Sequence, residues 1–164
     1  QRRWQQQEQQ RRRQQRQEHR EEQPFTSAEP AFDVSHIMNA ALAGCVTVTG
    51  GCAVLEPWAG VLAGFLGGFV YLSASAALVR FRVDDPLNAV PVHGACGAFG
   101  MLVTGLLASP ARVAAFYGPT VGSGFLYTGE PRLLAAQIIA SLVVTAWSAL
   151  IGLAVFVPMA LRDR

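Results

Sequence analysis

The sequence predicts an all-α polytopic membrane protein in which four transmembrane helices form the body of the chain. The main observation is that charged residues almost vanish after residue 36. Glu56 is the only charged residue between His36 and Arg80, and residues 86–111 and 133–161 contain no Asp, Glu, Lys or Arg. Because a helix needs about 20 apolar residues to cross ~30 Å of hydrocarbon, these uncharged runs indicate a bilayer rather than a soluble core.

Residues 1–36 form a separate Gln/Arg-rich segment, which we expect to be cytoplasmic and either disordered or a solvated helix. Residues 1–23 hold ten Gln, seven Arg and four Glu, with no aliphatic side chain. Such a composition cannot bury enough surface to offset the entropy lost on ordering. The segment lacks the apolar stretch of a signal peptide, and a start at Gln1 instead of Met suggests a piece of a longer protein.

The first two spans are expected over about residues 36–55 and 59–79. Ser35 is a suitable N-cap for the first span. The sequence Glu56-Pro57-Trp58 combines a charge, a helix breaker and an interfacial aromatic, which suits a turn at the membrane surface. In the second span three glycines recur every four residues, so they share a stripe on which another helix can approach closely; they are Gly60, Gly64 and Gly68.

The third span is expected over about residues 86–108, because Asp85 can cap a helix whose first residue is Pro86. Pro91 lies inside this span and should bend the helix or leave it partly unwound just before His93. Residues 109–131 are rich in Ser, Pro, Gly, Thr and Tyr and predict an extramembrane connection. The fourth span, about residues 133–161, is longer than a bilayer requires and must tilt or protrude.

Arginine is distributed unequally between the two predicted sides of the membrane. Four spans place both chain ends on one side, together with the loop at residues 80–85. That side holds eleven Arg, whereas the other holds two, Arg112 and Arg132. The positive-inside rule therefore predicts that the N-terminal tail and the C-terminus are cytoplasmic.

His93 is the main candidate for a functional residue, because ionisable side chains inside a membrane span are rare and often functional. On a regular helix it shares a face with Gly97, Gly100 and Thr104. A face of small and mildly polar residues next to an imidazole fits either a narrow conduit or close helix packing. The alternative to a transport role is a neutral histidine that bonds to a neighbouring helix, and helical spacing alone does not choose between them.

Other kinds of site find little support in the sequence. Cys45, Cys52 and Cys96 lie in apolar runs and are expected to be small packing residues rather than disulfide partners. His93 and Cys96 are three residues apart, but two ligands make a weak metal site, so no metal is predicted. No nucleophile elbow or phosphate loop is present. We therefore expect no enzyme activity and no cofactor, and the glutamates within the arginine tail argue against a nucleic-acid partner.

The sequence around His93 also resembles a known family. Residues 84–94, DDPLNAVPVHG, followed by Gly97, Gly100 and Thr104-Gly105, resemble the segment that precedes and enters the tenth helix of the Amt/Mep/Rh family of ammonium transporters. Residues 39–58 are similar to the family's eighth helix and its outer turn, and residues 133–160 occupy the place of its last helix. The resemblance implies that residues 37–164 are an ammonium-transporter-like transmembrane domain, part of an eleven-helix inverted-repeat fold.

The resemblance implies that the full protein recruits ammonium and conducts ammonia through a hydrophobic pore with a histidine proton relay. His93 would be the second of two pore histidines, the first belonging to the fifth helix, which is absent here. Gly97, Gly100 and Thr104 would belong to the same transport pore. Asp85 and Asn88 would lie at the inner mouth, although the family often has an acid where this chain has Asn88, which leaves an acidic role there open.

The resemblance also implies partners and a location. These are ammonium or ammonia, the lipid bilayer, most simply that of the plasma membrane, and two further copies in a homotrimer. The alternative hypothesis is a non-conducting membrane sensor or scaffold that uses its basic tail to bind a partner. Deleting residues 1–23 separates the two hypotheses, because a scaffold should lose its partner whereas a transporter should keep its flux.

Overall fold

The structure is a computed structural model that describes Glu8, Arg11 and residues 34–162. The chain divides into two units, residues 1–33 and residues 34–164. In the first unit only Glu8 and Arg11 are described, each of them helical and exposed. The predicted disordered or solvated-helix segment over residues 1–36 therefore lies almost wholly outside the described residues.

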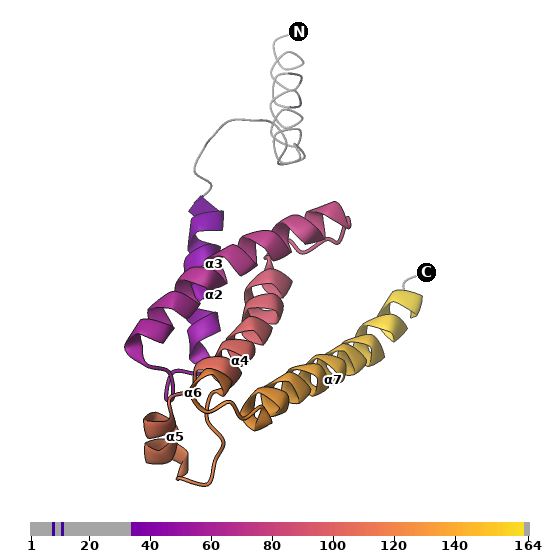
Figure 1. The fold of residues 1–164 in the computed structure, drawn as a ribbon. Helices are drawn as coiled ribbons and strands as arrows, with labels where there is room; N and C mark the ends of the chain where they lie inside the picture. The colour runs from indigo at the N-terminus through magenta and orange to yellow at the C-terminus, as the bar shows by residue number, and fades with distance from the viewer. Residues whose placement is uncertain (1–7, 9–10, 12–33, 163–164) are drawn as a thin grey trace. The chain divides into compact units, whose positions relative to one another are not determined.

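The described part of the second unit is helical throughout, apart from loops and one isolated antiparallel bridge between Leu55 and Ala108. Its elements follow one another along the chain as drawn in Figure 1. In order they are α2 (Val34–Thr49), α3 (Pro57–Arg80), the π-helix η1 (Val90–Ala95), α4 (Cys96–Leu107), α5 (Pro110–Tyr117), α6 (Phe125–Thr128) and α7 (Arg132–Arg162).

Three of these segments are long and apolar enough to cross a membrane: α3, the continuous η1 and α4, and α7. The predicted first span differs. Its helix α2 has 16 residues, which corresponds to about 24 Å at 1.5 Å per residue, less than the ~30 Å of a hydrocarbon core. The four expected spans are therefore three long helices and one short apolar helix.

The short first span has a local cause. Helix α2 ends at Thr49, six residues before the predicted end, where Gly50 and Gly51 follow each other. Glycine is the residue least suited to a helix after proline, and a methyl group on Gly51 would meet the side chains of Leu55 and Thr104. The chain instead forms tight turns, in which the amides of Val54 and Leu55 both donate to Gly51 O.

Helices α2, α3 and η1–α4 pack against one another around Thr47, which is fully buried. Gly67 of α3 and Gly100 of α4 both lie so close to Thr47 that a methyl group on either would overlap it. The Thr47 hydroxyl donates to Ala43 O at 2.9 Å, and Cys96 Sγ lies 3.4 Å from Gly67 O. Small residues thus bring three helices together, as membrane interiors require.

The cysteine prediction is confirmed for Cys96, which is buried at this crossing, whereas Cys45 and Cys52 are exposed free thiols. The glycine-stripe prediction is only partly right. Gly60 and Gly64 face Val48 of α2, but a methyl group on Gly68 would meet no described atom of another helix within 4 Å. The buried stripe of α3 runs one position earlier, along Ala59, Ala63, Gly67, Tyr71 and Ser75.

The turn after α2 and the connection after α4 meet at one end of the helices. Ser109 N–H donates to Val54 O at 2.9 Å, and Gly124 N–H donates to Ala108 O at 2.8 Å. The same connection contains the short helices α5 and α6. The loop between α3 and η1, residues 81–89, lies at the opposite end (Figure 1), so alternate connections lie at opposite ends, as successive membrane crossings require.

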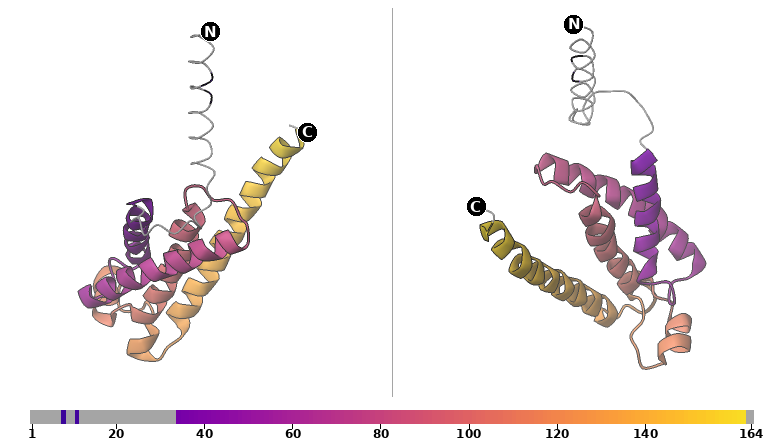
Figure 2. Two further views of the ribbon diagram at one scale, coloured as in Figure 1. Left: turned by 90° about the horizontal axis from the view of Figure 1, so that it is seen from above. Right: turned by 180° about the vertical axis from the view of Figure 1, so that it is seen from behind.

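Helix α7 packs mainly on α4, and no residue within it is buried. The contact is close where Gly105 meets Leu134, and Ser141 Oγ lies 3.1 Å from Met101 Sδ. Toward its C-terminus α7 diverges from α4 (Figure 2). Because most of its apolar side chains are exposed, this helix presents the surface expected of a segment surrounded by lipid or by further helices.

Candidate functional site

Asp85 fixes the start of the third span. Its Oδ1 accepts the amide of Ala89 at 3.0 Å and its Oδ2 accepts the amide of Val90 at 2.8 Å. The cap predicted for Asp85 is present only in part: its carboxylate accepts two amides at the helix start, but the residue that directly precedes the first helical turn is Ala89. The predicted helix start at Pro86 is wrong: regular helical structure begins about four residues later, with η1 at Val90.

His93 lies in a widened helical turn. Residues 90–95 form a π-helix, and the amide of Cys96 donates to Pro91 O, five residues earlier. Proline has no amide hydrogen and disturbs the regular α-helical ladder, and π-turns are found mostly as single turns inside α-helices, frequently at functional sites. The disturbance that Pro91 predicts just before His93 is therefore present.

The four predicted pore residues do not share one environment. His93 is exposed and Gly97 is half-buried, and a methyl group on Gly97 would meet no described atom within 4 Å. Gly100 and Thr104 are buried, and a methyl group on Gly100 would overlap the backbone carbonyl of Thr47. The Thr104 hydroxyl donates to Gly100 O at 2.9 Å. In this structure the first pair faces open space, whereas Gly100 packs against α2 and Thr104 against the turn that follows it.

Asn88, the second residue predicted at the inner mouth, stands immediately before the helical segment in a left-handed backbone conformation, with φ of 52°. Asparagine tolerates this region better than most residues. Its Oδ1 accepts a hydrogen bond from Ser75 Oγ at 2.9 Å, and Ser75 is buried on α3 with 7% exposure. Asn88 O accepts the amide of Val92 at 3.1 Å. Asn88 is therefore held by α3 and begins the helix that carries His93.

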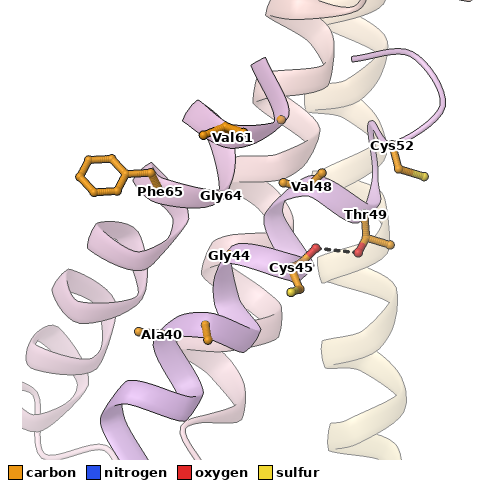
Figure 3. A pocket seen from close by; sticks show the side chains of 11 residues that line it. Ala40, Gly44, Cys45, Val48, Thr49, Cys52, Val61, Gly64 and Phe65 are labelled. Atoms are coloured by element: carbon orange, nitrogen blue, oxygen red, sulfur yellow. Dashed lines mark hydrogen bonds between the residues drawn. The ribbon is translucent and has the colours of Figure 1, made fainter. Parts of the chain in front are cut away.

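An open apolar groove of about 620 Å³ lies between α2 and α3, away from His93. Figure 3 shows Gly44 and Gly64 at its centre, where the two helix backbones approach. Along its α2 side, Thr49 Oγ1 donates to Cys45 O at 2.7 Å. Eleven residues line the groove: Ala40, Ala41, Gly44, Cys45, Val48, Thr49, Cys52, Gly60, Val61, Gly64 and Phe65.

At the other end of the helices Glu56 and Arg112 form an ion pair, with Arg112 Nε 3.0 Å from Glu56 Oε1. The Arg112 Nε–H group has no acceptor in hydrogen-bonding geometry among the described residues, so the Nε contact is an ion pair without a hydrogen bond. The pKa of the Glu56 carboxyl is lowered from its ordinary value, first by the Arg112 guanidinium and then by the Ser109 hydroxyl. The pair joins the turn before α3 to α5.

Two polar contacts were missed by the sequence analysis. Tyr71 is fully buried in α3, and its hydroxyl lies 2.8 Å from Nδ1 of His36, a residue to which no role was assigned. Ser75, four residues further along the same stripe, bonds to Asn88. Both are hydroxyl side chains on one face of an apolar span, and that spacing could have marked them, because polar groups inside a membrane usually face protein.

Comparison with known proteins decides what kind of membrane protein this is. Residues 26–161 match the group described as the Ammonium Transporter Family. The chain belongs to this family.

Three curated relatives in this family are 37–38% identical to the chain over the aligned residues. Ammonium transporter 1 member 4 of Arabidopsis thaliana is 38% identical over 118 residues, which cover 71% of this chain and 23% of the relative. Member 1 from the same plant is 37% identical over 129 residues, covering 77% and 26%. Member 3 of Solanum lycopersicum is 38% identical over 124 residues, covering 73% and 27%. The chain thus spans about a quarter of each of these relatives.

Among solved structures, the crystal structure of Saccharomyces cerevisiae Mep2 is similar to this chain with a TM-score of 0.51. The match covers 66% of this chain and 31% of that chain, at 19% sequence identity, and it shows the fold. The family is one of transporters rather than enzymes. The three long apolar helices of this chain agree with a membrane protein.

Proposed function

We propose that this chain supplies one wall of a pore that recruits ammonium and conducts ammonia across the membrane, with His93 in a proton relay. The observation that carries the proposal is the position of His93. It is the only His, Asp, Glu, Lys or Arg within residues 90–107, and it lies on the side of η1 that α2 and α3 leave exposed. An exposed imidazole at membrane depth is costly unless it meets a polar partner or a cavity.

The open face around His93 is what we expect of one wall of a pore whose other walls are formed by further helices. The relatives are about four times as long as the segment they share with this chain, so a transporter of that length has other helices to place against it. Gly97 belongs to this open face. We place both residues in the pore, and we assign the buried Gly100 and Thr104 the supporting role of setting the approach of α2 to α4.

The division between ammonium recruitment and ammonia conduction follows from solvation. Removing water from a cation inside hydrocarbon costs far more than removing it from a neutral amine. A pore with apolar walls therefore passes ammonia much more readily than ammonium, and it needs a group that accepts or relays the proton. A histidine is suited to that task because its protonation changes near neutral pH.

The remaining proposals concern the surroundings of the pore. Asp85 and Asn88 stand at the cytoplasmic mouth, and the capping bonds of Asp85 favour a structural role there. Arg80 and Arg82 lie at the same end of the helices, opposite Arg112, which supports cytoplasmic termini under the positive-inside rule. We further propose that the complete protein is a homotrimer in the plasma membrane.

The central test replaces His93 in the complete gene product. His93→Ala should lower ammonium uptake by about a hundredfold, since positioned proton-transfer groups contribute on that scale, while the amount of protein in the membrane stays normal. Val90→Ala is the matched control, because it removes an exposed side chain from the same π-helical turn. Wild-type uptake by His93→Ala at normal membrane amounts would contradict the proposed relay.

A further inference from the structure

We propose that Ser75 and Asn88 are positioning residues that set the direction of His93. This inference rests on the pore function proposed above, but it concerns a residue on a different helix, Ser75, and a contact with Asn88 that the sequence pattern does not predict. Ser75 lies on α3, 18 positions before His93 in the sequence, and it acts through Asn88 rather than on the transported molecule.

The geometry forms a short chain of contacts from α3 to the imidazole. Ser75 Oγ donates to Asn88 Oδ1 at 2.9 Å. Asn88 O then accepts the amide of Val92, the residue before His93, at 3.1 Å. Because Ser75 is buried on the α3 face that packs against η1, the contact ties the first helical turn to a fixed neighbour.

Asn88 is suited to this role by its backbone as well as by its side chain. With φ of 52° it adopts the left-handed backbone region immediately before the helix, a conformation that is unfavourable for most other residues. Asp85 supplies a second restraint through the amides of Ala89 and Val90. Restraints from two sides fix where the π-helical turn begins, and the starting point of a helix sets the direction of each side chain that comes after it.

A purely structural role would make different predictions from a positioning role. If the Ser75 hydroxyl only stabilises the fold, its removal should lower the amount of folded protein and leave the properties of each molecule unchanged. If it positions His93, each folded molecule should transport more slowly at saturating ammonium, with the same apparent affinity, because recruitment occurs elsewhere on the protein. The reactivity of position 93 should change as well.

The transport experiment compares variants of the complete gene product, normalised to the amount of protein in the membrane. Ser75→Ala should lower the maximal uptake rate by about threefold to tenfold, the range that corresponds to one hydrogen bond of ordinary strength, and Ser75→Thr should restore it. Asn88→Gly, which keeps the backbone freedom but removes the acceptor, should behave like Ser75→Ala. Ser73→Ala is the matched control, since the Ser73 hydroxyl bonds within α3, to Phe69 O at 2.8 Å, and it should transport normally.

A second measurement does not depend on transport. His93→Cys, in a background with Cys45→Ala and Cys52→Ala, is labelled with N-ethylmaleimide, and the chain that keeps His93 serves as the blank. Adding Ser75→Ala should change the labelling rate by about threefold or more, whereas adding Ser73→Ala should not. The proposal is overturned if Ser75→Ala leaves both the maximal uptake rate and the labelling rate unchanged. If His93→Ala itself transports normally, the pore function is wrong, and the labelling rate alone decides whether Ser75 positions this residue.

Discussion

The two ends of the third membrane span use the same residue types for different purposes. Around His93 and Gly97 the helix surface is open, and a methyl group on Gly97 would find free space. Around Gly100 and Thr104 the surface is buried, and a methyl group on Gly100 would overlap the Thr47 carbonyl. Gly97 and Gly100 are three residues apart on one helix, yet Gly97 lies on an open face and Gly100 lies at a helix crossing.

The difference arises from what stands opposite each residue. Helix α2 crosses α4 at Thr47, where only a glycine allows the two backbones to approach. The same helix does not cover the side chain of His93, which lies in the π-helical turn that also contains Pro91. A π-turn holds more residues per turn than an α-helix, so positions before and after it no longer align as a regular helix would align them.

The largest expected effect is on stability at the crossing. Gly100→Ala should lower the free energy of unfolding by about 1–3 kcal/mol, the usual cost of overpacking a close contact, because the obstructing atoms belong to the backbone of α2. The thermal unfolding midpoint of the purified protein in detergent measures it. Gly97→Ala should leave the midpoint unchanged or slightly higher, and equal midpoints for all three proteins would mean that the crossing at Thr47 is looser than the structure shows.

The next largest effect is expected on ammonium uptake, at Gly97. Gly97→Leu should fold normally but lower ammonium uptake at least about tenfold, which corresponds to a transport barrier raised by ~1.4 kcal/mol, because the larger side chain extends into the open face. Uptake per folded protein is the measurement. Normal uptake by this variant would remove Gly97 from the pore while leaving His93 to its own test.

A smaller effect is expected at Thr104, which packs at the crossing and bonds to its own helix. Thr104→Val should lower the free energy of unfolding by about 0.5–1.5 kcal/mol through the lost hydrogen bond, with uptake per folded protein unchanged. Thr104→Ser keeps the hydroxyl and serves as the control. A selective loss of uptake at normal stability would instead return Thr104 to the pore, where the sequence pattern had placed it.

The smallest effect concerns the Glu56–Arg112 ion pair, because both side chains are partly exposed and ion pairs that reach solvent contribute little. The lowered pKa of Glu56 means that its contribution is complete above the ordinary glutamate value of 4.5 and is lost as the pH falls through the lowered value. The thermal midpoint of the wild type should therefore fall slightly more on acidification than that of Glu56→Gln. Parallel pH profiles would show that the pair does not contribute to stability.

Much of the helical organisation could be predicted from the spacing of charges. The uncharged stretch at residues 133–161 predicted the position of α7 to within one residue at each end. A charged side chain is costly inside hydrocarbon, so a long stretch without charges indicates a membrane-spanning helix. The first span was predicted less well. Its apolar sequence continues to Leu55, but Gly50 and Gly51 end the helix at Thr49, and an apolar pattern alone does not distinguish a helix from a turn buried against its neighbours.

Composition and local spacing are enough to place the chain in a membrane, to put Asp85 at the entrance to its third span and to identify His93 as the one ionisable group within residues 90–107. These features depend on the composition of single segments, which solvation and local hydrogen bonding constrain directly. Only the tertiary structure decided which side of that span is covered by α2, and which hydroxyl of α3 reaches Asn88. Helices approach along faces set by side chains far apart in the sequence, so the spacing within one helix indicates which face is packed but not which helix packs on it.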